Sequence, residues 1–310
     1  MRIIKPFNDW MYKDSFCEKD IQKRDLEGFE NVTLPHTNRE IPFNYFDETE
    51  TMFISCYRKI FQPDIAWKGK RVFLRFGAVS SVAEVFLNGK KLCEHKGGYT
   101  AFAVELTENL VYEEENVITV KVDSTERNDV PPFGYLIDYL CYGGMYREVD
   151  LIVSDSTYVN VMHITPLNVM DEKKKVEVTL FVNALKVECG VPFKVELLDG
   201  EHIIAYCETV VDICEGDSKL QLSLEEVQGC TLWEPDSPQL YNVRATLGDT
   251  VVMERFGFRK IEFTSTGFLL NDKKMKLVGL NRHQSYPYVG YAMPKRLAIE
   301  PAAILRTITS

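Results

Sequence analysis

Short runs in which apolar and polar residues alternate recur through most of this 310-residue chain. In Arg71–Phe76 every second residue is apolar, and this period of two is typical of a half-buried strand. Val82–Leu87 is a second such run, and Asn88-Gly89 then predicts a hairpin, because a type I′ turn needs positive φ at both central residues. No helical period competes with these runs, so residues 51–153 are predicted to form a β-sandwich.

A second block of alternating runs extends from Tyr158 to Leu247, after a polar linker at 154–156. Its clearest run is Val176–Val182, in which alternate apolar residues line one face. About seven short strands in roughly 100 residues favour an immunoglobulin-like sandwich. The predicted fold class is therefore all-β, with two successive sandwiches.

The stretch Leu269–Met293 has a different character. Asn271-Asp272 marks a turn between two apolar runs, and Lys276–Leu280 reads as a short strand. Four polar residues, Asn281–Gln284, follow that strand at once. In barrel enzymes this position faces the active site, but a polar loop is an equally acceptable interpretation.

The charge balance excludes several classes of partner. Lys and Arg total 36 and Asp and Glu total 46, which gives a net charge of -10. This charge argues against nucleic acid and anionic membrane as partners and fits a neutral substrate. The start of the chain lacks the apolar core of a signal peptide, and no run approaches the roughly 18 apolar residues of a membrane span. A cytoplasmic location is expected.

Motifs that would identify a catalytic or metal site are missing from the sequence. It contains no G-x-S-x-G elbow, no phosphate-binding Walker loop and no H-E-x-x-H pair. The eight cysteines are scattered without a C-x-x-C pair, and none of the five histidines has the spacing of metal ligands. The residues alone therefore predict no cofactor.

A resemblance to a known family adds to this interpretation. The stretch LLNDKKMKLVGLNRHQSYPYVGYAM at 269–293 resembles the signature that opens the catalytic barrel of family two glycoside hydrolases. Further resemblances are LPHT at 34–37, YGGMYREV at 142–149, LWEPDSPQLY at 232–241 and FGFRKIE at 256–262. Within the family, NRHQ is most similar to the β-galactosidases, since β-glucuronidases usually carry Lys where this chain has Arg282.

The resemblance implies three domains and an incomplete catalytic apparatus. These are a jelly-roll sugar-binding domain at 1–155, an immunoglobulin-like β-sandwich at 156–262 and a truncated start of the catalytic (β/α)₈ barrel at 263–310. Retaining glycosidases need two carboxyl groups about 5–5.5 Å apart, and in this family both are glutamates on later barrel strands. No catalytic residue is therefore expected in this chain, which is predicted to be inactive alone. Trp233 and Arg259 are expected to be structural.

Three residues are expected to bind substrate by this resemblance. Asn38 matches a sugar-contacting asparagine, His283 matches a histidine that supports the sugar, and Asp138 matches an aspartate that contacts galactose hydroxyls and a sodium ion. Sodium or magnesium would belong to the full-length enzyme. The plain alternatives are a surface turn for Asp138 and a core histidine for His283.

The predicted function is the N-terminal, non-catalytic part of a retaining β-galactosidase, with a β-galactoside as ligand and a possible homo-oligomer. The alternative is a freestanding carbohydrate-binding or assembly module without catalysis. Another specificity within the family, β-glucuronidase or β-mannosidase, is disfavoured by Arg282-His283-Gln284.

Overall fold

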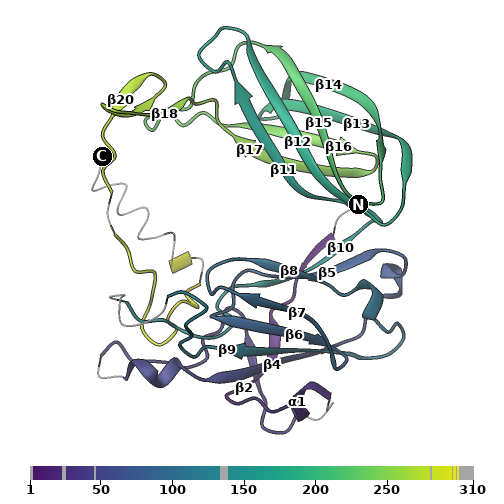
Figure 1. Cartoon of the computed structure of the whole chain (residues 1–310), viewed down its shortest axis with the longest axis vertical. Coiled ribbons are helices and arrows are strands. Elements are labelled where there is room, and N and C mark those ends of the chain that lie inside the picture. Colours follow the sequence, from purple (N-terminus) through teal and green to yellow (C-terminus); the bar gives the residue numbers. More distant parts are fainter. Residues whose placement is uncertain are drawn as a thin grey trace. The chain divides into compact units, whose positions relative to one another are not determined.

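A computed structural model of the chain describes residues 3–22, 26–44, 47–132, 139–279, 281–294, 296, 297 and 299. These residues divide into two compact units. One unit contains Ile3–Val153 together with the described residues from Asn281 onward, and the other extends from Ser154 to Gly279. We call them the N-terminal sandwich and the second sandwich. Both are built from β-strands, as predicted (Figure 1).

The N-terminal sandwich packs two sheets around one core. Its strands are β1 (Ile3–Pro6), β2 (Asp9–Lys13), β3 (Glu30–Thr33), β4 (Ile54–Phe61), β5 (Arg71–Phe76), β6 (Val82–Leu87), β7 (Lys90–Lys96), β8 (Phe102–Glu105), β9 (Asn116–Asp123) and β10 (Val149–Ser154). The order is β1-β10-β5-β8 in one sheet and β3-β2-β4-β9-β6-β7 in the other. Short helical turns connect them: α1 (Lys19–Gln22), η1 (Glu48–Thr51), η2 (Ile65–Trp67) and η3 (Thr107–Asn109).

The alternation that predicted these strands also forms the core. Val72, Leu74 and Phe76 of β5 are fully buried, and they pack with inward-facing residues of β6 and β9. Each such side chain contributes roughly 1.5–3 kcal/mol by leaving water. The predicted Asn88-Gly89 hairpin is confirmed, with φ of 51° and 87° between β6 and β7.

Residues 1–50 contain the short strands β1, β2 and β3, although no alternating run in the sequence predicted a strand there. These strands are only four or five residues long, too short for alternation to identify them. Trp10 of β2 is 2% exposed and packs in the core.

The second sandwich also consists of two sheets. Its strands are β11 (Thr157–Leu167), β12 (Lys174–Ala184), β13 (Glu188–Asp199), β14 (His202–Ile213), β15 (Gly216–Val227), β16 (Tyr241–Leu247) and β17 (Thr250–Phe256). They are ordered β11-β12-β15 and β14-β13-β16-β17. Val176, Val178, Leu180 and Val182 of β12 face its core, as predicted.

A small antiparallel sheet of β18 (Ile261–Thr264), β19 (Gly267–Leu270) and β20 (Lys273–Met275) completes this unit. The predicted turn at Asn271-Asp272 joins β19 to β20, with φ of 51° and 63°. The predicted strand at Lys276–Leu280 does not form over the described residues 276–279. Leu277 and Val278 are 64% and 84% exposed, so no neighbouring strand covers them there. The truncated barrel and the three domain boundaries stay predictions.

Among the residues that the structure describes, no helix has both the length and the apolar character of a membrane span.

Candidate functional site

Two sequence motifs of the N-terminal sandwich pair with each other. The LPHTN segment runs beside YGGM, and the amides of His36 and Asn38 donate to the carbonyls of Met145 and Gly143 at 2.9 and 3.1 Å. Gly144 has φ of 103°, and a Cβ there would lie 2.7 Å from the Asn38 nitrogen and 2.8 Å from the His36 carbonyl. Only glycine allows so close an approach, so the two motifs form one structural piece.

The hydroxyls of two buried tyrosines, Tyr12 and Tyr57, form hydrogen bonds with the paired motifs. Tyr57 is fully buried, its hydroxyl accepts from the Met145 amide at 3.3 Å, and it lies 2.8 Å from Nδ1 of His36. Burial raises the pKa of Tyr57 and lowers that of His36 to about 4. Tyr57 therefore stays protonated, and its hydroxyl donates a hydrogen bond to Nδ1 of a neutral His36. Tyr12 donates in the same way to the Asn38 carbonyl at 2.6 Å.

Asn38, a predicted sugar contact, is 4% exposed. Its Nδ2 donates to the carbonyl of Thr51 at 2.8 Å, and a side chain at Gly143 would overlap this amide. Its buried Oδ1 accepts no hydrogen bond within the described part of the chain. The amide is thus held in the fold by one bond and retains a free acceptor, and its contact with sugar stays a prediction.

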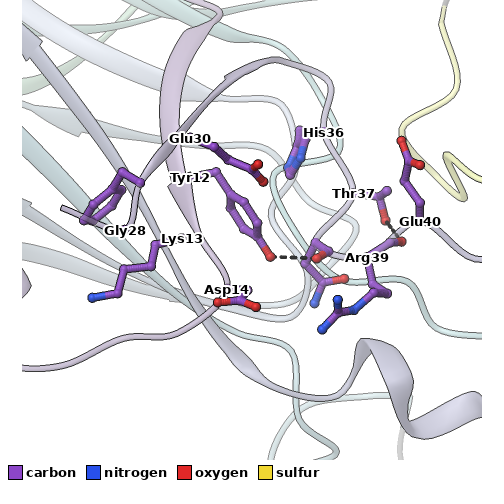
Figure 2. A pocket seen from close by; sticks show the side chains of 11 residues that line it. Tyr12, Lys13, Asp14, Gly28, Glu30, His36, Thr37, Arg39 and Glu40 are labelled. Atoms are coloured by element: carbon purple, nitrogen blue, oxygen red, sulfur yellow. Dashed lines mark hydrogen bonds between the residues drawn. The ribbon is translucent and has the colours of Figure 1, made fainter. Parts of the chain in front are cut away.

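Asn38 also lines a hollow of about 670 Å³ beside β2 and β3 (Figure 2). The other lining residues come from 12–14, 28–30 and 36–40 and include both charges. Lys13 is bonded to Asp20 at 3.0 Å, and the Arg39 guanidinium lies 5.3 Å from the Phe53 ring centre. The hollow presents polar groups to solvent, but Asn38 is the one predicted sugar-binding residue among those that line it.

The segment after Asn281 returns to the N-terminal sandwich. Tyr288 forms an antiparallel bridge with Ile41, with nitrogen-to-oxygen distances of 2.8 and 3.3 Å. Further along, Arg147 donates to the carbonyl of Tyr291 at 2.7 Å, and the Tyr291 hydroxyl donates to the Leu140 carbonyl at 3.0 Å. Ile41, Leu140 and Arg147 of the N-terminal sandwich therefore all contact this segment.

His283, the second predicted sugar contact, is exposed. Its ring meets that of Tyr139 edge-on, with centroids 5.7 Å apart and an interplanar angle of 76°. Tyr139 directly follows Asp138, which lies outside the described residues. The structure thus places His283 against Tyr139, in the same unit as Asn38.

No group of three His, Cys, Asp or Glu side chains with metal-ligand geometry occurs among the described residues. Because Asp138 is not among them, the predicted sodium contact stays a prediction.

The two motifs of the second sandwich also meet each other. The Trp233 amide donates to the Phe258 carbonyl at 2.8 Å, and Arg259 lies 5.2 Å from the centre of the Trp233 ring. A Cβ at Gly257 would lie 2.8 Å from that of Trp233. These contacts are local: Arg259 packs on the Trp233 ring, and Trp233 is half-buried and stands outside the core cluster of the second sandwich, which it was expected to fill.

Sequence reasoning missed Tyr57, Arg147 and Tyr291, which hold the site together. The one usable signal was the pair Gly143-Gly144, since adjacent glycines outside a hairpin indicate a close backbone approach.

Comparison with family models agrees with this architecture. Residues 17–154 match the sugar binding domain of glycosyl hydrolases family 2, and residues 157–259 match a second model described as glycosyl hydrolases family 2. Together they account for more than half of the chain. The chain belongs to glycosyl hydrolase family 2 and contains its N-terminal sugar-binding and immunoglobulin-like domains.

The individual relatives include proteins named β-galactosidase and proteins named β-glucuronidase. A β-galactosidase of Thermoanaerobacterium thermosulfurigenes is 39% identical over 99% of this chain and 44% of its own length. A β-glucuronidase of Bacteroides fragilis is 31% identical over 96% of this chain and 44% of its own length. The crystal structure of a Bacteroides uniformis β-glucuronidase superposes with a TM-score of 0.88 at 24% identity, covering 99% of this chain and 38% of that one, and shows the shared fold. The chain therefore spans less than half the length of these relatives.

Proposed function

We propose that this chain is the N-terminal, non-catalytic part of a retaining β-galactosidase, which hydrolyses terminal β-D-galactosides. The observation that carries the proposal is the 39% identity to a β-galactosidase over 99% of the chain, against 31% for a β-glucuronidase. A second β-galactosidase, from Thermoanaerobacter pseudethanolicus, is 37% identical over 98% of the chain. The Arg282-His283-Gln284 sequence supports the same specificity.

In this proposal Asn38, Asp138 and His283 contact sugar hydroxyls away from the reacting carbon, and Asp138 also contacts sodium. The convergence of 36–41, 139–147 and 283–293 on one unit supports a shared role. An amide, a carboxylate and an imidazole are suited to hydroxyl pairs, since they donate and accept in fixed directions. Cytoplasmic location and homo-oligomerisation belong to the proposal as well.

The chain alone is proposed to be inactive. Retention requires a carboxylate nucleophile and a carboxylic acid about 5–5.5 Å apart at the anomeric carbon. The family resemblance assigns both to barrel strands that follow the region matched here. Groups that contact remote hydroxyls cannot replace them, because they do not stabilise the charge that develops at that carbon.

A second candidate function is a freestanding carbohydrate-binding module. It is favoured by the match of 17–154 to a sugar binding domain and by the polar hollow beside Asn38. Such a module would bind sugar without requiring any later segment.

The deciding experiment compares this chain with a longer version that carries the catalytic barrel, on chromogenic β-galactoside, β-glucuronide and β-mannoside. We expect the longer protein to cleave the galactoside preferentially and the 310-residue chain to cleave none. Preference for the glucuronide would overturn the proposed specificity. In the longer protein Asp138→Ala should lower kcat/KM by roughly 10- to 100-fold, as loss of a charged hydrogen bond of about 1.5–3 kcal/mol implies.

A further inference from the structure

We infer that residues 286–293, here called the clasp, hold His283 against the N-terminal sandwich, and that Gly290 and Arg147 are positioning residues for it. The inference deepens the proposed function, because it rests on His283 having a role toward sugar. Its structural part, the docking of the clasp, is independent of any substrate.

The clasp is closed by backbone hydrogen bonds at two places. Tyr288 and Ile41 exchange bonds of 2.8 and 3.3 Å, which tie the clasp to the sandwich. Tyr286 and Gly290 exchange bonds of 2.9 and 3.1 Å, which close the clasp into a turn. Residues 276–279 upstream are exposed, and they make no such backbone bond to another residue in the described part of the chain. The backbone bonds that hold this part of the chain in place are therefore made by residues after His283 in the sequence.

Tyr291 anchors the clasp in an aromatic cluster. Its ring centre lies 4.9 Å from that of Tyr142, 5.4 Å from that of Tyr146 and 6.0 Å from that of Tyr99. Its hydroxyl donates to the Leu140 carbonyl at 3.0 Å. Burial raises the pKa of Tyr291 to about 12, so the side chain stays neutral. Tilted and edge-on aromatic pairs at these distances are favourable beyond the area they bury, so the cluster is a substantial contact.

Arg147 connects the clasp to the glycine motif. One of its terminal nitrogens, Nη1, lies 2.9 Å from the carbonyl of Tyr146 and 2.7 Å from that of Tyr291, and donates to both. The guanidinium also lies 4.8 Å from the centre of the Tyr146 ring. Lysine cannot reproduce this planar arrangement, because its ammonium is a single point of charge. Arg147 thus fixes the clasp to the irregular segment that leads into β10.

Gly290 allows the close approach. It has φ of 53°, and a Cβ at this position would overlap the ring of Tyr142. Ala292 and Met293, just beyond it, are 4% and 6% exposed. A side chain at Gly290 would therefore push the clasp off the sandwich and release His283 from Tyr139.

The test is hydrogen exchange at the Tyr288 and Gly290 amides in the full chain, together with the ring signals of His283 in NMR, assigned with His283→Gln. We expect slow exchange in the parent protein and exchange at least tenfold faster in Gly290→Ala. The matched control is Gly69→Ala, because Gly69 belongs to the same unit, has φ of 82° and has no atom within 4 Å of its would-be Cβ. Amides of β9 report whether the sandwich stays folded.

A second measurement separates positioning from general stability. Tyr139→Leu should shift the His283 ring signals in the parent protein and leave them unchanged in Gly290→Ala. Arg147→Lys should retain part of the amide protection that Arg147→Ala loses. Random-coil exchange at Tyr288 in the parent, equal effects of Gly290→Ala and Gly69→Ala, or His283 signals insensitive to Tyr139→Leu in the parent would each overturn the inference. None of these readouts involves a sugar, so failure of the proposed function would appear separately.

Discussion

At the scale of single residues, the site depends on which side chains stay neutral. His36 is a neutral hydrogen-bond acceptor within the paired motifs. Burial disfavours its charged form, and the Tyr57 hydroxyl donates a hydrogen bond to its Nδ1. A protonated His36 would lose this hydrogen bond and bring a charge into the sandwich.

This neutral state predicts acid sensitivity. The pKa of His36 falls from 6.5 to about 4 on folding, so its contribution to stability is complete above pH 6.5 and is lost as pH falls toward 4. Between pH 7 and pH 5 the loss should be about 2 kcal/mol. We expect His36→Asn, which keeps an acceptor near Nδ1 but does not titrate, to remove that part of the pH dependence. Urea unfolding of both proteins at the two pH values measures it, and equal losses would contradict the assignment.

At the scale of elements, pairs of sequence motifs hold each other in place. LPHTN pairs with YGGM in one unit, and LWEP pairs with FGFR in the other. In each case a glycine permits contact with atoms that a side chain would displace. The motifs that carry the family resemblance therefore have a structural role, because each pair holds two distant segments of its unit together.

Gly144→Ala tests the first pairing. The new Cβ would meet two backbone atoms at 2.7 and 2.8 Å in a φ region that suits only glycine, so we expect a loss of about 3 kcal/mol or more. Gly69→Ala is the control, since Gly69 lies in the same unit and also has positive φ but open space around it, and it should cost about 1 kcal/mol. Protection of β9 amides from hydrogen exchange reports the difference. Similar protection in the two variants would show that the close approach is not required.

The turn between β19 and β20 offers a matched pair of substitutions. Asn271 and Asp272 both have positive φ, but only Asn271 is buried. Its side chain accepts from the Lys260 amide at 3.0 Å and donates to the Trp233 carbonyl at 3.0 Å. Asn271→Gly should therefore lower the stability of the second sandwich by about 1–3 kcal/mol, and Asp272→Gly by less than about 0.5 kcal/mol. Thermal unfolding compares them, and a reversed order would refute the role given to the buried amide.

At the scale of the whole molecule, the two predicted binding residues that the structure describes lie on one unit. Asn38 and His283 belong to the N-terminal sandwich, although 245 positions separate them in the sequence. The sugar contacts proposed for Asn38 and His283 therefore do not depend on the second sandwich, and the catalytic pair is proposed to lie outside both units.

The purified chain should accordingly bind galactose at millimolar concentration or more weakly, which corresponds to a binding free energy of only about 4 kcal/mol. It should show no turnover of a chromogenic β-galactoside. Calorimetry and the assay, with heat-killed protein and a mock purification as controls, measure both. Turnover that follows this chain through purification and disappears on mutation of one of its acidic residues would contradict the proposal.

The sequence by itself determined most strands of both sandwiches and the turns at Asn88-Gly89 and Asn271-Asp272. These features are local, because alternation and positive φ depend on residues within a few positions of each other. The short strands before residue 50 escaped this reasoning, since four or five residues carry too little pattern. The motifs themselves were also visible, but their mutual pairing was not.

Only the tertiary structure decided where the segment after Asn281 lies. The sequence suggested a barrel strand at Lys276–Leu280, whereas the structure leaves 276–279 exposed and docks 286–293 on the N-terminal sandwich. That docking depends on contacts such as Tyr291 with Leu140, which are 151 positions apart. No local pattern encodes such a contact, because its energy exists only when both partners are already folded into place.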